Sequence, residues 1–205
     1  MRSVEAERGN ILTEDGRMLA TSLPFFDIAF DPVSSGMKEE DFVQNIDSLS
    51  YCLATYVDNT YTPGGFKEYL MQERRDSNKY VLLKKGATFR EKEIMSRFPL
   101  FNKGQFEGGF IAKPYFKRAR PFGLMARRTI GYVRDNAKPV GLEGYFDETL
   151  AGQEGRQMML MVDRANETWI PIENLTRIEP ERGDDIVTTL DMEMQAITED
   201  ALLHA

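Results

Sequence analysis

The chain has 205 residues, a length that suits one domain or one domain with part of another. Its 26 basic and 33 acidic residues give a net charge of −7, which argues against nonspecific binding to nucleic acid. The single cysteine, Cys52, excludes an internal disulfide, and the single histidine, His204, leaves too few ligands for a zinc-type site, so we expect no metal and no cofactor. The chain has neither an apolar run of roughly 18 residues, as a membrane span needs, nor a signal-peptide pattern at its start.

The first thirty residues predict β-structure. Asp15-Gly16 is a typical hairpin turn between residues 9–12 and 17–20. Phe26, Ile28 and Phe30 then alternate with Asp27, Ala29 and Asp31, which is the pattern of a half-buried strand.

Helical signals follow. Apolar residues spaced by three or four predict a helix over about 39–57, and Thr62-Pro63 begins a second one. Thr88 and Glu91 form a capping box before a third helix, after a short strand at 80–83. The face of the first helix comprises Phe42, Ile46, Leu49, Leu53 and Tyr56.

The second half predicts shorter elements. We expect an extended segment over 108–120, helices over 122–132 and 146–151, and paired strands at 157–162 and 169–172. Residues 180–183 are the best candidate domain boundary. A strand at 186–190 and a helix capped by Asp191 would begin a second domain that is cut short.

Two features suggest other functions. The basic stretch 113–134 contains no acid and would be a solvated face, a buried arginine network or a site for an anionic glycan or lipid. Ser35 and Lys38 fit the Ser-x-x-Lys pattern of a stand-alone acylase, but the Ser-x-Asn and Lys-Thr-Gly partners are missing from the sequence.

Four short motifs occur in order. The first comprises Arg8-Gly9-Asn10-Ile11, Asp15-Gly16 and Leu19-Ala20, and the second Arg120-Pro121-Phe122-Gly123-Leu124-Met125-Ala126 and Gly131-Tyr132. The third comprises Gly141-Leu142-Glu143, Tyr145-Phe146-Asp147, Leu150, Gly152 and Gly155, and the fourth runs from Gly183 to Asp191. Together they resemble the N-terminal, non-catalytic module of class B penicillin-binding proteins, although Thr13 and Glu14 depart from that family's Asp-Arg. Residues 23–27 are most similar to cell-division members from the Bacteroidetes.

The resemblance implies an elongated α+β pedestal over residues 1–182, with a small helical head at about 39–98 and the start of a transpeptidase domain at 183–205. It implies no catalytic residue here, and a parent D,D-transpeptidase that forms an acyl-enzyme on serine. That parent would be anchored at the periplasmic face of the inner membrane by an N-terminal helix outside this sequence. Expected partners are its own transpeptidase domain, a membrane-embedded glycan polymerase, other cell-division proteins and a second copy in a homodimer.

The resemblance also implies that the motifs meet where pedestal and catalytic domain join. On that basis Arg8 and Glu143 should lie close together, with Arg120 near enough to join them. The residues assigned to this junction are Arg8, Gly9, Asp15, Gly16, Arg120, Gly123, Gly141, Glu143, Asp147 and Gly152.

Overall fold

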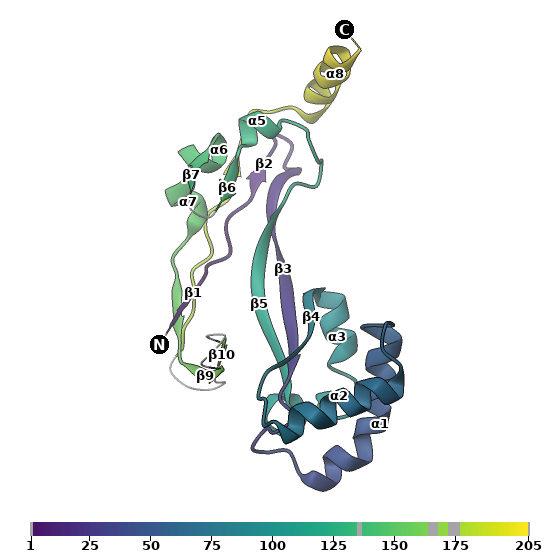
Figure 1. The fold of residues 1–205 in the computed structure, drawn as a ribbon. Coiled ribbons are helices and arrows are strands. Elements are labelled where there is room, and N and C mark those ends of the chain that lie inside the picture. Colours follow the sequence, from purple (N-terminus) through teal and green to yellow (C-terminus); the bar gives the residue numbers. More distant parts are fainter. Residues whose placement is uncertain (1, 135–136, 164–167, 172–176, 205) are drawn as a thin grey trace. The chain divides into compact units, whose positions relative to one another are not determined.

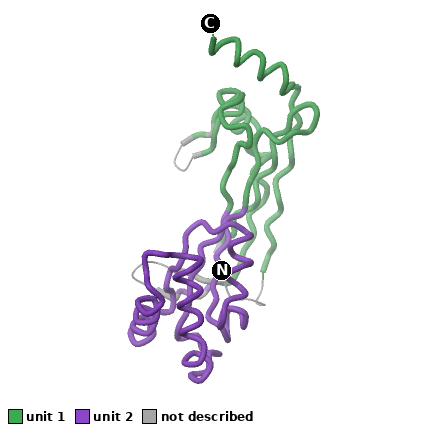
Figure 2. The backbone as a smooth tube through the Cα atoms, turned by 90° about the vertical axis from the view of Figure 1, so that its right-hand side faces the viewer, with its two compact units in different colours: residues 1–23, 116–158, 174–205 green, residues 24–115, 159–173 purple. Residues whose placement is uncertain are grey.

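The computed structural model describes residues 2–134, 137–163, 168–171 and 177–204 (Figure 1). It is a mixed α+β structure, so the expected fold class is confirmed. The chain divides into two compact units: unit 1 holds residues 1–23, 116–158 and 174–205, and unit 2 holds residues 24–115 and 159–173 (Figure 2).

Unit 2 contains the longer helices. In chain order its elements are the end of β3 (Met18–Phe30), α1 (Glu39–Tyr56), α2 (Pro63–Arg75), β4 (Val81–Thr88), α3 (Phe89–Met95), the 3-10 helix η1 (Phe101–Lys103), α4 (Gly104–Gly108), the start of β5 (Phe110–Ala119), β9 (Met159–Asp163) and β10 (Thr168–Pro171). Strands β9 and β10 pair antiparallel, as the sequence predicts, and the loop that joins them lies outside the described residues.

The helices of unit 2 form where their caps and apolar faces predict. Four of the five expected face residues of α1 are buried, whereas Tyr56 is 65% exposed. The Thr62 hydroxyl accepts a hydrogen bond from the Gly65 N–H, and Pro63 is the first residue of α2. Residues Phe66 and Leu70 of α2 join the α1 face in one core with the end of β3.

Residues 28–30 of the predicted strand are buried on both faces. Strand β3 pairs antiparallel with β4, and Ile28 and Phe30 pack into the helical core. Ala29, which faces the other way, is also fully buried, because Ile111 of β5 and Tyr80 cover it. The alternation of residue types therefore predicted the strand correctly but did not predict the full burial of Ala29 on its second face.

Unit 1 consists of short strands and short helices. Its elements are β1 (Arg2–Val4), β2 (Ile11–Leu12), the start of β3, the end of β5, α5 (Arg127–Ile130), β6 (Tyr132–Arg134), β7 (Ala137–Val140), α6 (Leu142–Tyr145), α7 (Asp147–Ala151), β8 (Gly155–Gln157), β11 (Arg177–Ile178), β12 (Ile186–Val187) and α8 (Met192–Leu203). Strands β1, β8 and β11 form one sheet, β6 pairs with β7, and β2 lies between β12 and β3. The core of the unit includes Ile11, Leu19, Ile130 and Leu150.

Two predicted elements of unit 1 are shorter than expected. Only 127–130 is helical within the expected helix 122–132, because Gly123 and Ala126 adopt positive φ angles of 62° and 50° that an α-helix cannot contain. The expected strand 186–190 pairs only over β12, after which the Thr188 hydroxyl donates to the Leu12 carbonyl. The hairpin at Asp15-Gly16 forms as predicted, since β2 and the start of β3 pair antiparallel across it.

The helices within the described ranges are all too short or too polar to cross a membrane.

Candidate functional site

Unit 1 contains a buried carboxylate, Glu143 of α6. Its side chain is only 1% exposed, and it binds two arginines from distant parts of the sequence. Arg8 Nε donates to Glu143 Oε2 at 2.7 Å, and Arg118 Nε of β5 donates to Oε1 at 2.8 Å. We call Arg8, Arg118 and Glu143 the arginine–carboxylate cluster. Each carboxylate oxygen accepts a charge-assisted hydrogen bond, which is the condition under which a buried charge is tolerated.

Further hydrogen bonds connect the cluster to the surrounding backbone. Arg8 Nη2 donates to the Glu143 carbonyl at 2.8 Å, and Arg8 Nη1 pairs with Asp147 of α7 at 2.7 Å. Arg118 Nη1 donates to the Gly9 carbonyl at 2.7 Å and to Ser22 Oγ at 3.1 Å. The cluster therefore joins the N-terminal segment, β3, β5 and the α6–α7 turn.

The charges of the arginine–carboxylate cluster indicate a structural role. Burial lowers the pKa of the Arg118 guanidinium, and the neighbouring Glu143 carboxylate opposes that shift. Arg118 Nη2 is buried and has no hydrogen-bond partner among the described residues. The two guanidinium groups hold the Glu143 carboxylate between them, so the arrangement fixes the geometry of the segments that it joins.

The expected place of Arg120 in this cluster is taken by Arg118. Strand β5 ends at Ala119, and Arg120 lies beyond it, where its Nη1 donates to the Gly131 carbonyl at 3.5 Å. Arg118, which is within the strand, binds Glu143 instead. The acid-free basic stretch suggested a buried arginine network but did not identify which arginine belongs to it.

The glycines assigned to the junction differ in what surrounds them. A Cβ at Gly9 would lie 2.0 Å from the Asp184 carbonyl oxygen, and one at Gly152 would lie 2.3 Å from that of Glu181. Gly141 is also crowded by backbone atoms and has a φ of 70°. Gly16 and Gly123 have positive φ angles but open space around them. Close backbone approach thus explains the first three, and turn geometry explains the other two.

Asp15 and Asp185 both bind the chain near β2. Asp15 accepts a hydrogen bond from the Thr13 hydroxyl, and this bond lowers the pKa of the Asp15 carboxyl. Asp185 accepts the Asn10 N–H at 2.7 Å and pairs with Arg182 at 2.6 Å. Asp185 belongs to the fourth motif but was not among the expected site residues.

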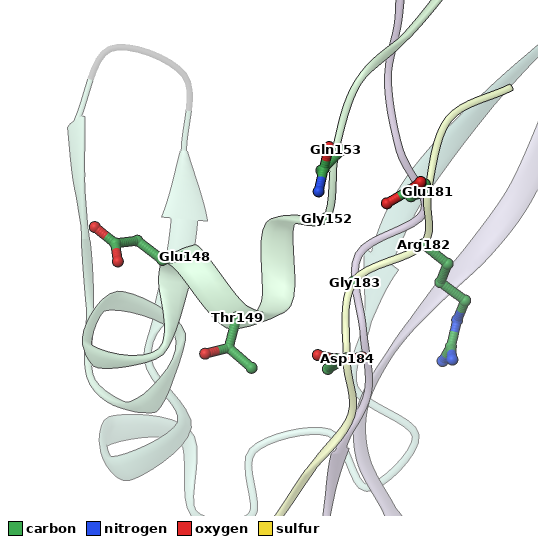
Figure 3. A pocket seen from close by; sticks show the side chains of 8 residues that line it. All are labelled: Glu148, Thr149, Gly152, Gln153, Glu181, Arg182, Gly183 and Asp184. Carbon is green, nitrogen blue, oxygen red and sulfur yellow. The ribbon is translucent and has the colours of Figure 1, made fainter. Parts of the chain in front are cut away.

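A shallow pocket of about 340 Å³ lies between the α7 end and residues 181–184 (Figure 3). Backbone hydrogen bonds of 2.9 Å join Gln153 and Glu181 in both directions along one side of it. Within the described ranges, no group of three or more histidines, cysteines or acids is placed to hold a metal ion. The pocket is lined by Glu148, Thr149, Gly152, Gln153, Glu181, Arg182, Gly183 and Asp184.

The residues of the two sequence features that suggested other activities do not come together in one site. Ser35 lies in an exposed turn and Lys38 precedes α1, and no hydrogen bond joins them. In the basic stretch, Arg118 is bound in the cluster, whereas Arg127 and Arg128 are exposed beside a shallow pocket with Tyr132. The Arg134 side chain lies outside what the structure describes.

Comparison with known proteins identifies the fold. The family model of the penicillin-binding protein dimerisation domain matches residues 3–188. The peptidoglycan D,D-transpeptidase MrdA of Escherichia coli K12 is 25% identical over 97% of this chain and 32% of its own length. The probable peptidoglycan D,D-transpeptidase PenA of Neisseria gonorrhoeae is 23% identical over 100% of this chain and 32% of its own.

Solved structures agree with the family match. Penicillin-binding protein 2X from Streptococcus thermophilus superimposes with a TM-score of 0.73 at 20% identity, over 99% of this chain and 31% of that one. Penicillin-binding protein PBP2 of Helicobacter pylori, solved as a complex with MreC, gives a TM-score of 0.51 at 19% identity, over 99% of this chain and 38% of that one. The chain thus spans about a third of the length of the curated relatives it matches.

Proposed function

This chain belongs to the penicillin-binding protein dimerisation domain family, and we propose that it is the non-catalytic pedestal of a peptidoglycan D,D-transpeptidase. The observation that carries the proposal is the family match over 3–188, in relatives that are about three times as long and named as transpeptidases. The pedestal positions a transpeptidase domain that follows residue 182, and its arginine–carboxylate cluster holds the junction rigid.

The parent protein would work at the periplasmic face of the inner membrane, held there by an N-terminal helix. We propose that the pedestal docks membrane partners of the cell-wall machinery, such as a glycan polymerase. The H. pylori neighbour was solved in complex with MreC, which supports a docking role for this fold. The similarity of residues 23–27 to cell-division members favours division over elongation.

Acylation by penicillin tests the proposal directly. The full-length protein that contains this chain should form one covalent adduct with a fluorescent penicillin, mapped by mass spectrometry to a serine outside residues 1–205. The isolated chain should form none, and Ser35→Ala in the full-length protein should leave the adduct intact. Acylation of Ser35 itself would support the stand-alone acylase and overturn the pedestal.

A further inference from the structure

A groove between α1 and α2 of unit 2 carries an inference that rests on the proposed docking function and extends it. The groove has a volume of about 420 Å³. We propose that this α1–α2 groove docks an amphipathic helix of another protein, one with an apolar stripe and an acidic flank. It is lined by Glu39, Phe42, Val43, Ile46, Asp47, Lys67, Met71, Arg74 and Arg75.

The floor and walls of the groove are apolar. Phe42 and Ile46 form the floor and are almost completely buried, because they also belong to the core of unit 2. Val43 on α1 is 59% exposed and Met71 on α2 is 41% exposed, so the walls present apolar surface to solvent. Burial of such surface by a partner would be favourable by about 25 cal/mol per Å².

Two ion pairs join α1 and α2 at the groove. Arg74 pairs with Glu39 at 2.5 Å, and its guanidinium carbon lies 4.2 Å from the centre of the Phe42 ring. In the second pair, Lys67 binds Asp47 at 2.6 Å. Residues 39 and 47 are eight positions apart on α1, which corresponds to about 12 Å.

This length selects the kind of occupant. A span of about 12 Å accommodates two turns of helix, so it fits apolar side chains at positions i, i+3 or i+4, and i+7 of a docked helix. The two exposed wall residues provide much less surface than the roughly 800 Å² per partner that a standard protein interface buries. The groove therefore suits one helix of a partner better than a stable dimer of this chain.

The charge at the rim selects the flank of that helix. Glu39, Asp47, Lys67 and Arg74 neutralise one another in the two ion pairs. Arg75 is exposed at the end of α2 and forms no ion pair within the described part of the chain. One unpaired cation beside an apolar groove favours a carboxylate on the partner and disfavours a basic helix.

Two synthetic peptides would test the proposal against this chain. Both peptides are about 16 residues long, because shorter isolated helices are only marginally stable in water. Both have leucines at positions i, i+4 and i+7. One has glutamates on its flanks and the other has lysines. Fluorescence anisotropy should show binding of the acidic peptide and at least about tenfold weaker binding of the basic one.

Matched variants locate the binding. Met71→Glu and Arg75→Glu should each weaken the acidic peptide by about tenfold or more. Leu82→Glu and Arg90→Glu, at positions of comparable exposure elsewhere in unit 2, should change affinity by less than about twofold. Circular dichroism and a melting curve would confirm that each variant is folded.

Several results would overturn the groove. These are binding of neither peptide, equal binding of both, or equal losses in the test and control variants. Sedimentation showing self-association that Met71→Glu abolishes would assign the groove to a second copy, against the proposal. If the peptides fail to bind but penicillin acylates the full-length protein outside residues 1–205, the groove proposal is wrong and the pedestal function stands. If penicillin acylates Ser35, the pedestal function is wrong, and peptide binding is unaffected.

Discussion

Glu143 is the residue whose removal should matter most for stability. Truncation by Glu143→Ala would remove the carboxylate that binds both Arg8 and Arg118, whose side chains are largely buried, although Arg8 would keep its pair with Asp147. Breaking a buried ion pair in this way costs about 3–5 kcal/mol, so the free energy of unfolding should fall by that order. Urea denaturation of the wild type and the variant would measure the loss.

A double-mutant cycle separates the cluster from a general loss of packing. Adding Arg8→Ala to Glu143→Ala should cost much less than Arg8→Ala alone, since the two residues share one interaction. As a control, Glu93→Ala breaks the exposed pair of Glu93 with Arg97 and should cost about 1 kcal/mol or less. Strict additivity of Arg8→Ala and Glu143→Ala would show that the contact contributes nothing.

Gly152 and Gly16 offer a matched test of close backbone approach. Both have positive φ, but a Cβ at Gly152 would collide with backbone atoms, whereas Gly16 has open space. Gly16→Ala should therefore cost about 1 kcal/mol, from the left-handed backbone alone. Gly152→Ala should cost at least about twice as much, because the 181–183 segment must shift. Equal losses in thermal denaturation would contradict this explanation.

Helix α3 should lose part of its stability in acid. Glu91 accepts a hydrogen bond from Lys84 Nζ at 2.8 Å and two from Thr88, and these lower the pKa of its carboxyl from 4.5 to about 2. Because the folded-state pKa is the lower one, this contribution is fully present above pH 4.5 and is lost as the pH falls toward 2. The urea midpoint should fall less between pH 5 and 3 in Glu91→Gln than in the wild type.

Helix α8 should exchange its amide hydrogens faster than α1. Met192 is buried and the Glu199 carboxylate accepts the Ala126 N–H at 2.8 Å, but Ile197 is 71% exposed and Leu202 is 73% exposed. Hydrogen exchange followed by mass spectrometry should thus show weak protection over 195–203 at low protein concentration. Protection equal to that of α1 in a dilute monomer would contradict it.

Short-range sequence signals predicted helices, caps and turns better than they predicted the tertiary surroundings of those elements. The capping box of α3, the Thr62-Pro63 start of α2 and the Asp15-Gly16 hairpin each formed as expected, because their physics lies within a few residues. The helix expected over 122–132 forms only over 127–130, since positive φ at Gly123 and Ala126 depends on the surrounding turn. Propensity is a weak prior wherever tertiary contacts determine the backbone.

Contacts between residues far apart in the sequence were harder to predict than the order of the motifs along the chain. The proximity of Arg8 and Glu143 was expected only through the family resemblance, because 135 positions separate the two residues. The choice of Arg118 over Arg120 depends on where β5 ends, which no local pattern specifies. The cover on the second face of β3 likewise depends on β5, a strand about 80 positions away along the chain.

At the scale of the whole molecule, the chain belongs to the penicillin-binding protein dimerisation domain family, and the role that we propose for it is that of a pedestal. The family model matches residues 3–188. In unit 1, Arg8 and Arg118 neutralise the buried Glu143 carboxylate. We expect such a pedestal to act on catalysis through position alone, so its variants should alter cross-linking of peptidoglycan without altering the reactivity of the catalytic serine.

The most direct measurement compares these two activities in the full-length protein carrying Glu143→Gln, a change that removes the charge and keeps the shape. Well below the melting temperature, the rate of acylation by penicillin should stay within about twofold of the wild type, while the rate of peptidoglycan cross-linking should fall by about tenfold or more. Ser35→Ala serves as the control and should change neither rate. If Glu143→Gln leaves cross-linking unchanged, or lowers both rates equally in a folded protein, the pedestal account is contradicted.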